Sequence, residues 1–156
     1  EELEQGTLEF DDDNDSTHEQ ELIILNLVSM DKSNFNMNQV LTLLKNLDAK
    51  YVNGFFSYRD LNGREVYRIA SGINPGLLEV DTETNLLLMA LDLNQANDPM
   101  RAFEAMLESA SSISEKLHAS ICDAKRAPLS KQMIEHLKSR AQEISHLNSM
   151  KNISAQ

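Results

Sequence analysis

The sequence has little cysteine, few basic residues and no long apolar run, and each shortage excludes a class of protein or site. A single cysteine, Cys122, among 156 residues rules out an internal disulfide and a cysteine-cluster metal site, and it fits a reducing compartment. No apolar run approaches the ~18–20 residues of a membrane-spanning helix, so we expect this stretch to be soluble. Only 14 basic residues stand against 25 acidic ones, and the net charge of −11 disfavours binding to a nucleic-acid backbone.

Acidic residues are concentrated at the start of the chain. Residues 1–20 hold nine of them and no Lys or Arg, so nine of the eleven net negative charges belong to this segment. It has few apolar residues and no period, which is typical of disorder. We therefore predict a disordered acidic linker end over residues 1–19, a folded domain over residues 20–147, and a disordered tail over residues 148–156.

The acidic segment partly matches a calcium-binding loop. Asp11, Asp13 and Asp15 alternate as at the start of an EF-hand loop. The sixth position, however, is Ser16 instead of glycine, and the twelfth is Leu22 instead of a bidentate glutamate. We therefore predict a solvated linker, with no metal site and no cofactor.

Apolar runs and periods in the remaining chain predict an α+β fold. Strands are expected over residues 22–28, 52–60, 65–73, 85–91 and 120–123. Helices are expected over residues 37–47, over residues 99–117 with Asp98 as N-cap, and after a capping Ser130. The order β-α-β-β-β-α-β-α predicts an antiparallel sheet of the split β-α-β type with three helices on one face.

The Asn62-Gly63 dipeptide predicts a two-residue type I′ turn between two strands. Such a turn pairs Phe56 with Ile69 and Tyr58 with Tyr67, and this set is expected to face the helices. The alternate set is expected on the other face of the sheet: Phe55, Ser57, Arg68 and Ala70, beside Leu22, Ile24, Leu86, Leu88 and Ala90.

That second face is the most informative feature of the sequence. The strands at residues 22–28 and 85–91 are apolar at both odd and even positions, whereas three helices can cover only one face of a small sheet. An uncovered apolar sheet face indicates a partner surface. The alternative is that a helix or another subunit covers it.

Catalytic patterns are absent from the sequence. His18, His118, His136 and His146 include no pair at metal-ligand spacing on a helix, and Cys122 belongs to no recognisable nucleophile motif. No phosphate loop, nucleotide-binding fingerprint or nucleophile elbow occurs. We therefore predict a protein that is not an enzyme.

Several short segments, in this order and spacing, resemble the C-terminal domain of ZipA cell-division proteins, which binds FtsZ. The resemblance extends from about residue 21 to residue 144 and rests on these segments: Leu22-Ile23-Ile24-Leu25-Asn26-Leu27, Phe56-Ser57-Tyr58-Arg59, Ile73-Asn74-Pro75-Gly76, Leu87-Leu88-Met89-Ala90-Leu91, Phe103-Glu104-Ala105-Met106-Leu107 and Asp123-Ala124-Lys125-Arg126.

The resemblance implies a non-catalytic, monomeric adaptor whose open sheet face forms a groove for the C-terminal tail of FtsZ. It also implies an N-terminal transmembrane anchor and a linker in the full-length protein, which would hold this domain at the cytoplasmic face of the bacterial inner membrane and tether FtsZ filaments there for septation. The groove expected from sheet register and from the resemblance comprises Leu22, Ile24, Asn53, Gly54, Phe55, Ala70, Gly72, Asn74, Leu88 and Ala90.

The chain departs from the family pattern inside this groove. Gly54 and Gly72 stand where family members have large flexible side chains, Asn74 where a lysine is common, and Leu88 where an aromatic ring is common. We expect the two glycines to leave bare backbone for a ligand. The alternative function is binding of a small ligand or single-stranded RNA by the same face, since sheets that bind RNA carry exposed aromatic residues with basic surroundings.

Overall fold

The computed structural model describes residues 19–154, so the disorder predicted for residues 1–19 lies, apart from Glu19, outside the described residues. The elements in chain order are β1 (Leu22–Ser29), α2 (Met37–Asn46), β2 (Ala49–Val52), β3 (Phe55–Arg59), β4 (Glu65–Ser71), β5 (Leu86–Asp92), α3 (Pro99–Leu117), β6 (Ala119–Cys122) and α4 (Lys131–Ser154).

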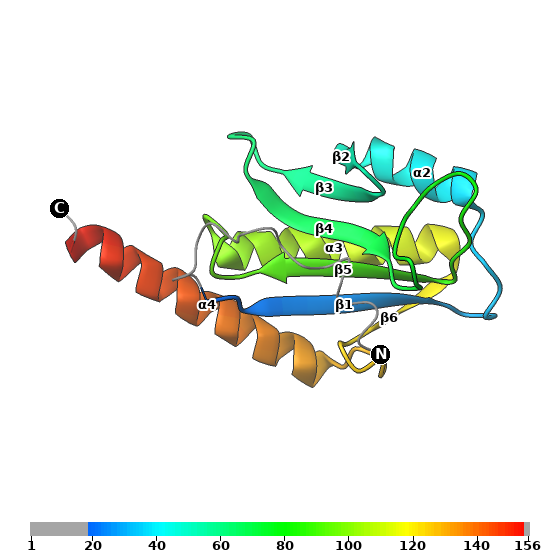
Figure 1. The fold of residues 1–156 in the computed structure, drawn as a ribbon. Coiled ribbons are helices and arrows are strands. Elements are labelled where there is room, and N and C mark those ends of the chain that lie inside the picture. Colours follow the sequence, from blue (N-terminus) through cyan, green and yellow to red (C-terminus); the bar gives the residue numbers. More distant parts are fainter. Residues whose placement is uncertain (1–18, 155–156) are drawn as a thin grey trace.

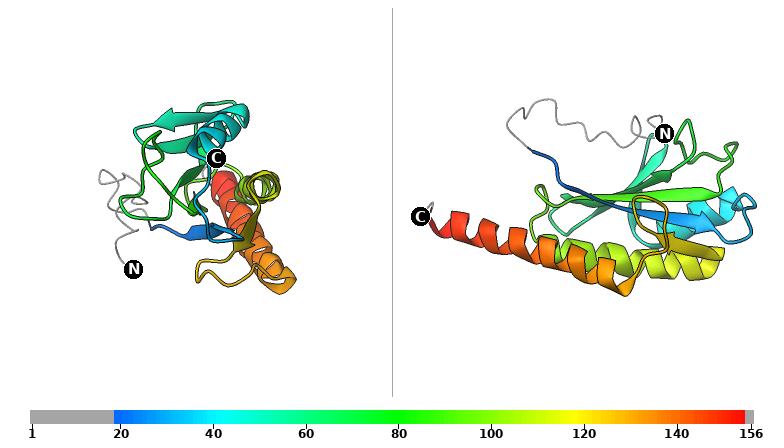
Figure 2. Two further views of the ribbon diagram at one scale, coloured as in Figure 1. Left: turned by 90° about the vertical axis from the view of Figure 1, so that its right-hand side faces the viewer. Right: turned by 90° about the horizontal axis from the view of Figure 1, so that it is seen from below.

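The strands form one antiparallel sheet in the order β2-β3-β4-β5-β1-β6 (Figure 1). Helices α3 and α4 lie on one side of this sheet, as Figure 2 shows, and α2 packs into the same core. The predicted α+β architecture, an antiparallel sheet with three helices on one face, is confirmed.

The core lies between the sheet and the helices because strand side chains alternate between the two faces. On β1, Ile23, Leu25 and Leu27 point into it and are at most 3% exposed. Phe56 pairs with Ile69 and Tyr58 with Tyr67, as the sequence predicts, and the two tyrosine rings stack at 4.9 Å between centroids. The predicted assignment of residues to the two faces of the hairpin is therefore correct.

The predicted helix starts are also correct. Asp98 accepts a hydrogen bond from the backbone N–H of Arg101, and Pro99 is the first residue of α3. The hydroxyl of Ser130 accepts a hydrogen bond at 3.0 Å from the backbone N–H of Met133. Both side chains satisfy backbone donors that have no partner within the helix.

The single strand predicted over residues 52–60 is wrong. The chain turns back at Asn53 and Gly54, which both have positive φ angles of 48° and 99°, so that β2 and β3 form a separate hairpin. Two consecutive positive φ angles are the signature of a type I′ turn. The Asn53-Gly54 dipeptide thus carries the same turn signal in the sequence as Asn62-Gly63.

At Asn62 and Gly63 the predicted two-residue turn is wrong, although the pairing of the strands is correct. Only Gly63 has a positive φ, and the Asp60 N–H donates to the carbonyl of Arg64, which closes a longer loop. The Asp60 carboxylate accepts backbone N–H bonds from both Asn62 and Arg64, and this stabilises the longer loop. A register shift next to Tyr58 then restores the predicted pairing.

The predicted end of the folded part near residue 147 is also wrong, because α4 continues to Ser154. The sequence of α4 contains neither glycine nor proline, so nothing stops the helix at residue 148. Ile144 is the last residue of α4 in the core, whereas Leu147 and Met150 are exposed. The end of the helix therefore projects beyond the sheet (Figures 1 and 2).

Candidate peptide-binding face

Half of the predicted groove residues form one apolar cluster on the sheet face opposite the helices. Ala70, Leu88 and Ala90 are buried at its centre, and the half-buried side chains of Ile24 and Phe55 pack against them. Sheet register sets this arrangement, since Ile24 lies opposite Ala90, and Ala70 lies opposite Leu88. The cluster is separate from the main core, as expected for a second apolar face.

The other predicted residues lie around this cluster. Leu22 is 37% exposed and stands opposite Asp92 at one end of β1. Asn53 and Asn74 are exposed in loops, in the β2–β3 turn and after β4. They therefore lie at the rim of the face and not in its apolar centre.

The expectation of bare backbone at the two glycines is wrong, because leucines of the same chain cover them. A Cβ atom added at Gly54 would lie 2.5 Å from Cδ2 of Leu77, and one added at Gly72 would lie 2.6 Å from Cγ of Leu86. The β4–β5 loop reaches Gly54 because the N–H of Leu78 donates to the Gly54 carbonyl at 2.7 Å. Leucines from elsewhere in the chain thus occupy the space that we assigned to a ligand.

Sequence reasoning placed Leu86 on this face but missed Leu77. A signal was present, since two adjacent leucines follow the Asn74-Pro75-Gly76 turn in a segment that, apart from Val80, is otherwise polar. Apolar side chains in a loop commonly pack back onto the body of a domain.

Polar groups on this face bond to one another. The Arg68 guanidinium lies 4.8 Å from the centre of the Phe55 ring and pairs with Glu65 at 2.8 Å. The Nε of Arg59 donates to the hydroxyl of Ser57 at 3.1 Å. The positive charge beside the aromatic ring is therefore partly neutralised by a neighbour.

Cys122 stands on the same face, opposite Asn26 in the pairing of β1 with β6. Burial, and to a lesser degree the nearby Asp123, raises the pKa of its thiol. The thiol therefore stays protonated at neutral pH and is a poor nucleophile. Within residues 19–154 no three His, Cys, Asp or Glu side chains are grouped so as to hold a metal ion, and no described helix is long and apolar enough to cross a membrane.

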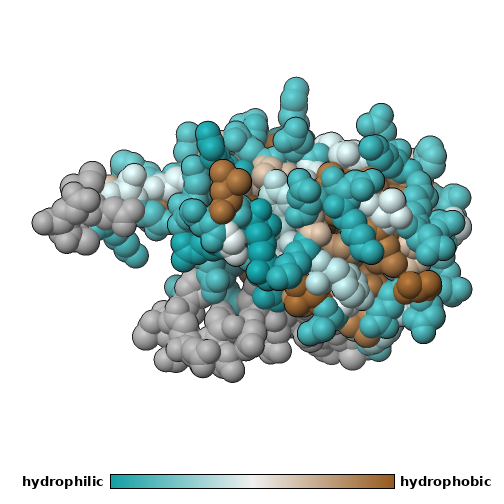
Figure 3. All heavy atoms as spheres, turned by 90° about the horizontal axis from the view of Figure 1, so that it is seen from above, coloured by the Kyte–Doolittle hydropathy of each residue, from teal (hydrophilic) through white to brown (hydrophobic). Residues whose placement is uncertain are grey.

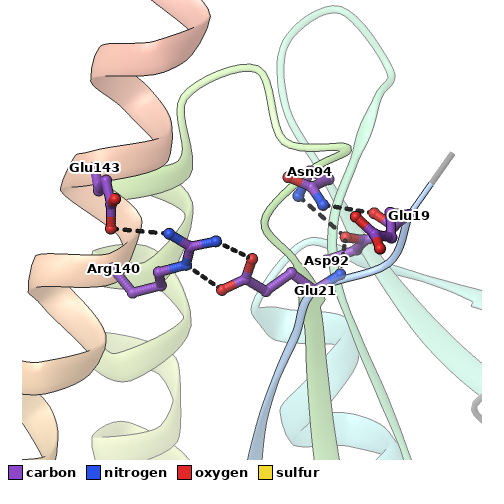
Figure 4. Close-up of polar contacts among 6 residues, drawn as sticks. All are labelled: Glu19, Glu21, Asp92, Asn94, Arg140 and Glu143. Atoms are coloured by element: carbon purple, nitrogen blue, oxygen red, sulfur yellow. Dashed lines mark hydrogen bonds and ion pairs between the residues drawn. The ribbon is translucent and has the colours of Figure 1, made fainter.

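An ion pair ties the residue just before β1 to α4 (Figure 4). Arg140 donates two hydrogen bonds to the Glu21 carboxylate, one of them at 2.7 Å, and a third to Glu143 at 2.8 Å. The hydrogen bonds from Arg140 to the Glu21 carboxylate lower the pKa of Glu21. The backbone N–H of Glu21 also donates to Asp92 at 3.2 Å, which ties the start of β1 to the end of β5.

A hollow of about 650 Å³ lies at the β2 edge, outside the predicted groove. Figure 3 shows hydrophobic side chains gathered on this side, over the region of α2, β2 and the β4–β5 loop, among mostly hydrophilic neighbours. The hollow is lined by Leu41, Lys45, Tyr51, Glu79, Val80 and Asp81.

The chain is similar to known cell-division proteins. The family model of the C-terminal FtsZ-binding domain of ZipA matches residues 21–140. The cell division protein ZipA of Colwellia psychrerythraea is 29% identical over 133 residues, which cover 80% of this chain and 35% of that protein. ZipA of Pseudomonas aeruginosa is 25% identical over 128 residues, which cover 77% of this chain and 44% of that protein. This chain therefore spans about a third to a half of the length of these relatives.

Proposed function

Because this chain belongs to the family of ZipA C-terminal FtsZ-binding domains, we propose that its open sheet face binds the C-terminal tail of FtsZ. In this role the domain is a non-catalytic adaptor in cell division. In the full-length protein it tethers FtsZ filaments to the inner membrane from its cytoplasmic side, through an anchor outside the residues that we describe.

The observation that carries this proposal is the apolar cluster of Ile24, Phe55, Ala70, Leu88 and Ala90. It lies on the face of the sheet opposite the three helices and is not part of the main hydrophobic core. Apolar side chains gathered in this way favour a partner that brings apolar side chains of its own.

The same features favour a peptide over single-stranded RNA. RNA-binding sheets offer free aromatic rings for base stacking and unpaired cations for phosphates. Here the Arg68 guanidinium lies over Phe55 and pairs with Glu65, so neither the ring nor the charge is fully available.

Calorimetric titration of the domain with an FtsZ tail peptide tests the proposal, and Ile24→Asp is the informative variant. Ile24 is half-buried at the edge of the cluster, so a carboxylate there should leave the fold intact. It would, however, lie against the apolar part of the bound peptide. Loss of the apolar contact and burial of a charge should weaken binding ~10-fold or more.

Leu147→Asp is the matched control, because Leu147 is 47% exposed on the projecting end of α4. This variant should bind the peptide as the unmodified domain does. Absence of peptide binding by the unmodified domain, or equal weakening by both substitutions, would refute the proposal. Tighter binding of a single-stranded RNA oligonucleotide would support the alternative function.

A further inference from the structure

Asn26 is a buried polar residue on the open face beside the apolar cluster, and the peptide site described above does not use it. It lies on β1 between Leu88 on β5 and Cys122 on β6. Strand alternation places its side chain on the same face as Ile24, away from the helices. Only 2% of the residue is exposed.

The carboxamide of Asn26 uses only one of its two ends. Its Nδ2 donates a hydrogen bond at 2.9 Å to the backbone carbonyl of Asp123, which fixes the orientation of the amide group. Its Oδ1 is buried and has no hydrogen-bond partner. An unsatisfied buried acceptor is unfavourable, and buried polar groups in folded proteins nearly always have a partner.

We propose that Asn26 Oδ1 accepts a hydrogen bond from a backbone N–H of the peptide that binds this face. This inference rests on the proposed function and adds a polar, orienting contact to an otherwise apolar groove. The oxygen is buried in the free domain, so the side chains that cover it move aside when the peptide binds.

The unsatisfied oxygen of Asn26 and the backbone N–H groups of a bound peptide complement each other. A peptide that lies extended on an apolar face loses water from some of its backbone N–H groups, and each of these then needs an acceptor. In the row of side chains formed by Cys122, Asn26, Leu88 and Ala70, the Asn26 oxygen is the one strong acceptor. Its fixed orientation means that little side-chain entropy is lost when the bond forms.

The test is a double-mutant cycle by calorimetry. Asn26→Leu removes the acceptor at similar size, and a series of FtsZ tail peptides, each methylated at one backbone nitrogen, removes the donors one at a time. We expect Asn26→Leu to weaken binding by about 3- to 10-fold, the usual range for one hydrogen bond. At one peptide position, methylation should weaken binding to the unmodified domain by a clearly larger factor than binding to Asn26→Leu.

Ser114→Ala is the matched control. Ser114 carries the other buried side-chain atom without a partner among the described residues, but it lies on α3, in the helix layer. Its replacement should leave peptide affinity unchanged. If Asn26→Leu fails to fold, the NMR chemical shift of the side-chain carbonyl carbon (Cγ) of Asn26 in the unmodified domain tests the inference instead. We expect this shift to move downfield on saturation with peptide.

The outcomes separate this inference from the proposed function. If the unmodified domain binds peptide, and Asn26→Leu binds it equally well without coupling to any methylated position, the role of Asn26 is overturned while the proposed function stands. An Asn26 carbonyl shift that does not move on saturation has the same meaning. If the unmodified domain does not bind the peptide at all, both proposals fail.

Discussion

At the scale of single residues, two glycines are required in the open face for different physical reasons. Gly54 has a φ of +99°, a conformation that side chains with a Cβ rarely adopt, and Leu77 fills the space above it. The φ of Gly72 is not in the left-handed region, and its constraint is purely the space taken by Leu86. A smaller side chain at position 86 can therefore make room for a substitution at Gly72, whereas a smaller side chain at position 77 would not remove the backbone strain at Gly54.

We predict that Gly72→Ala destabilises the domain through contact with Leu86. The new Cβ would lie 2.6 and 2.7 Å from Cγ and Cδ2 of Leu86, closer than such atoms can approach. Overpacking of this kind costs about 1–3 kcal/mol of unfolding free energy. Urea denaturation of the two proteins measures the difference.

The control is the same substitution in a Leu86→Ala background. With the leucine side chain removed, the added methyl group has room, and Gly72→Ala should cost much less than in the unmodified domain. An equal cost in both backgrounds would show that Leu86 is not the cause.

At the scale of elements, the ion pair between Arg140 and Glu21 joins α4 to the start of β1 (Figure 4). Helix α4 extends far past its last core residue, Ile144. The ion pair therefore ties α4 to the sheet at the start of β1.

We predict that the stabilisation from this ion pair is lost in acid. The folded-state pKa of Glu21 lies below its ordinary value of 4.5, mainly because Arg140 donates hydrogen bonds to the carboxylate. A carboxylate whose pKa is lowered in the folded state stabilises the fold fully at pH values above its unfolded-state pKa. This stabilisation is lost as the pH falls through its folded-state pKa. At neutral pH, Arg140→Ala should lower the Tm by about 2–4 °C, because the pair is partly exposed.

Thermal melts of both proteins at neutral pH and at about pH 3 check this loss of stabilisation. The difference between Arg140→Ala and the unmodified domain should shrink towards zero in acid. Lys151→Ala, which removes a cation from the last turn of the same helix, should show no such pH dependence. A Tm difference that persists at low pH would assign the effect to lost packing instead of charge.

At the scale of the whole molecule, charge and core are segregated along the chain. Residues 1–18 contain eight acidic residues and no Lys or Arg, whereas the main core extends from Ile23 to Ile144. The part of the chain that carries most of the net charge is therefore separate in sequence from the part that forms the core.

We predict that a protein lacking residues 1–18 folds with a Tm within a few degrees of the full chain. None of the core residues is removed by this deletion, and repulsion among the acidic residues is relieved. Differential scanning calorimetry of both proteins at equal ionic strength measures it. A larger fall in Tm would mean that the acidic segment contributes to the fold.

How far the sequence predicts this fold depends on the range of the interaction concerned. The alternation of side chains and the pairing of Phe56 with Ile69 follow from local geometry, so the two faces of the hairpin were predictable. The turn at Asn53-Gly54 was equally local and was predictable in principle. The length of α4 does not follow from its apolar period, because a helix without glycine or proline continues past its last core residue, Ile144.

The sequence by itself determined which residues alternate onto the second face and that this face would be apolar, because that information lies in the two-residue period of each strand. Only the tertiary structure decided what lies above Gly54 and Gly72, because Leu77 and Leu86 reach them through loop closure and strand pairing. It also decided the surroundings of Asn26, because strand order places it between Leu88 on β5 and Cys122 on β6. Pairing partners depend on contacts between distant parts of the chain, and a local pattern does not record them.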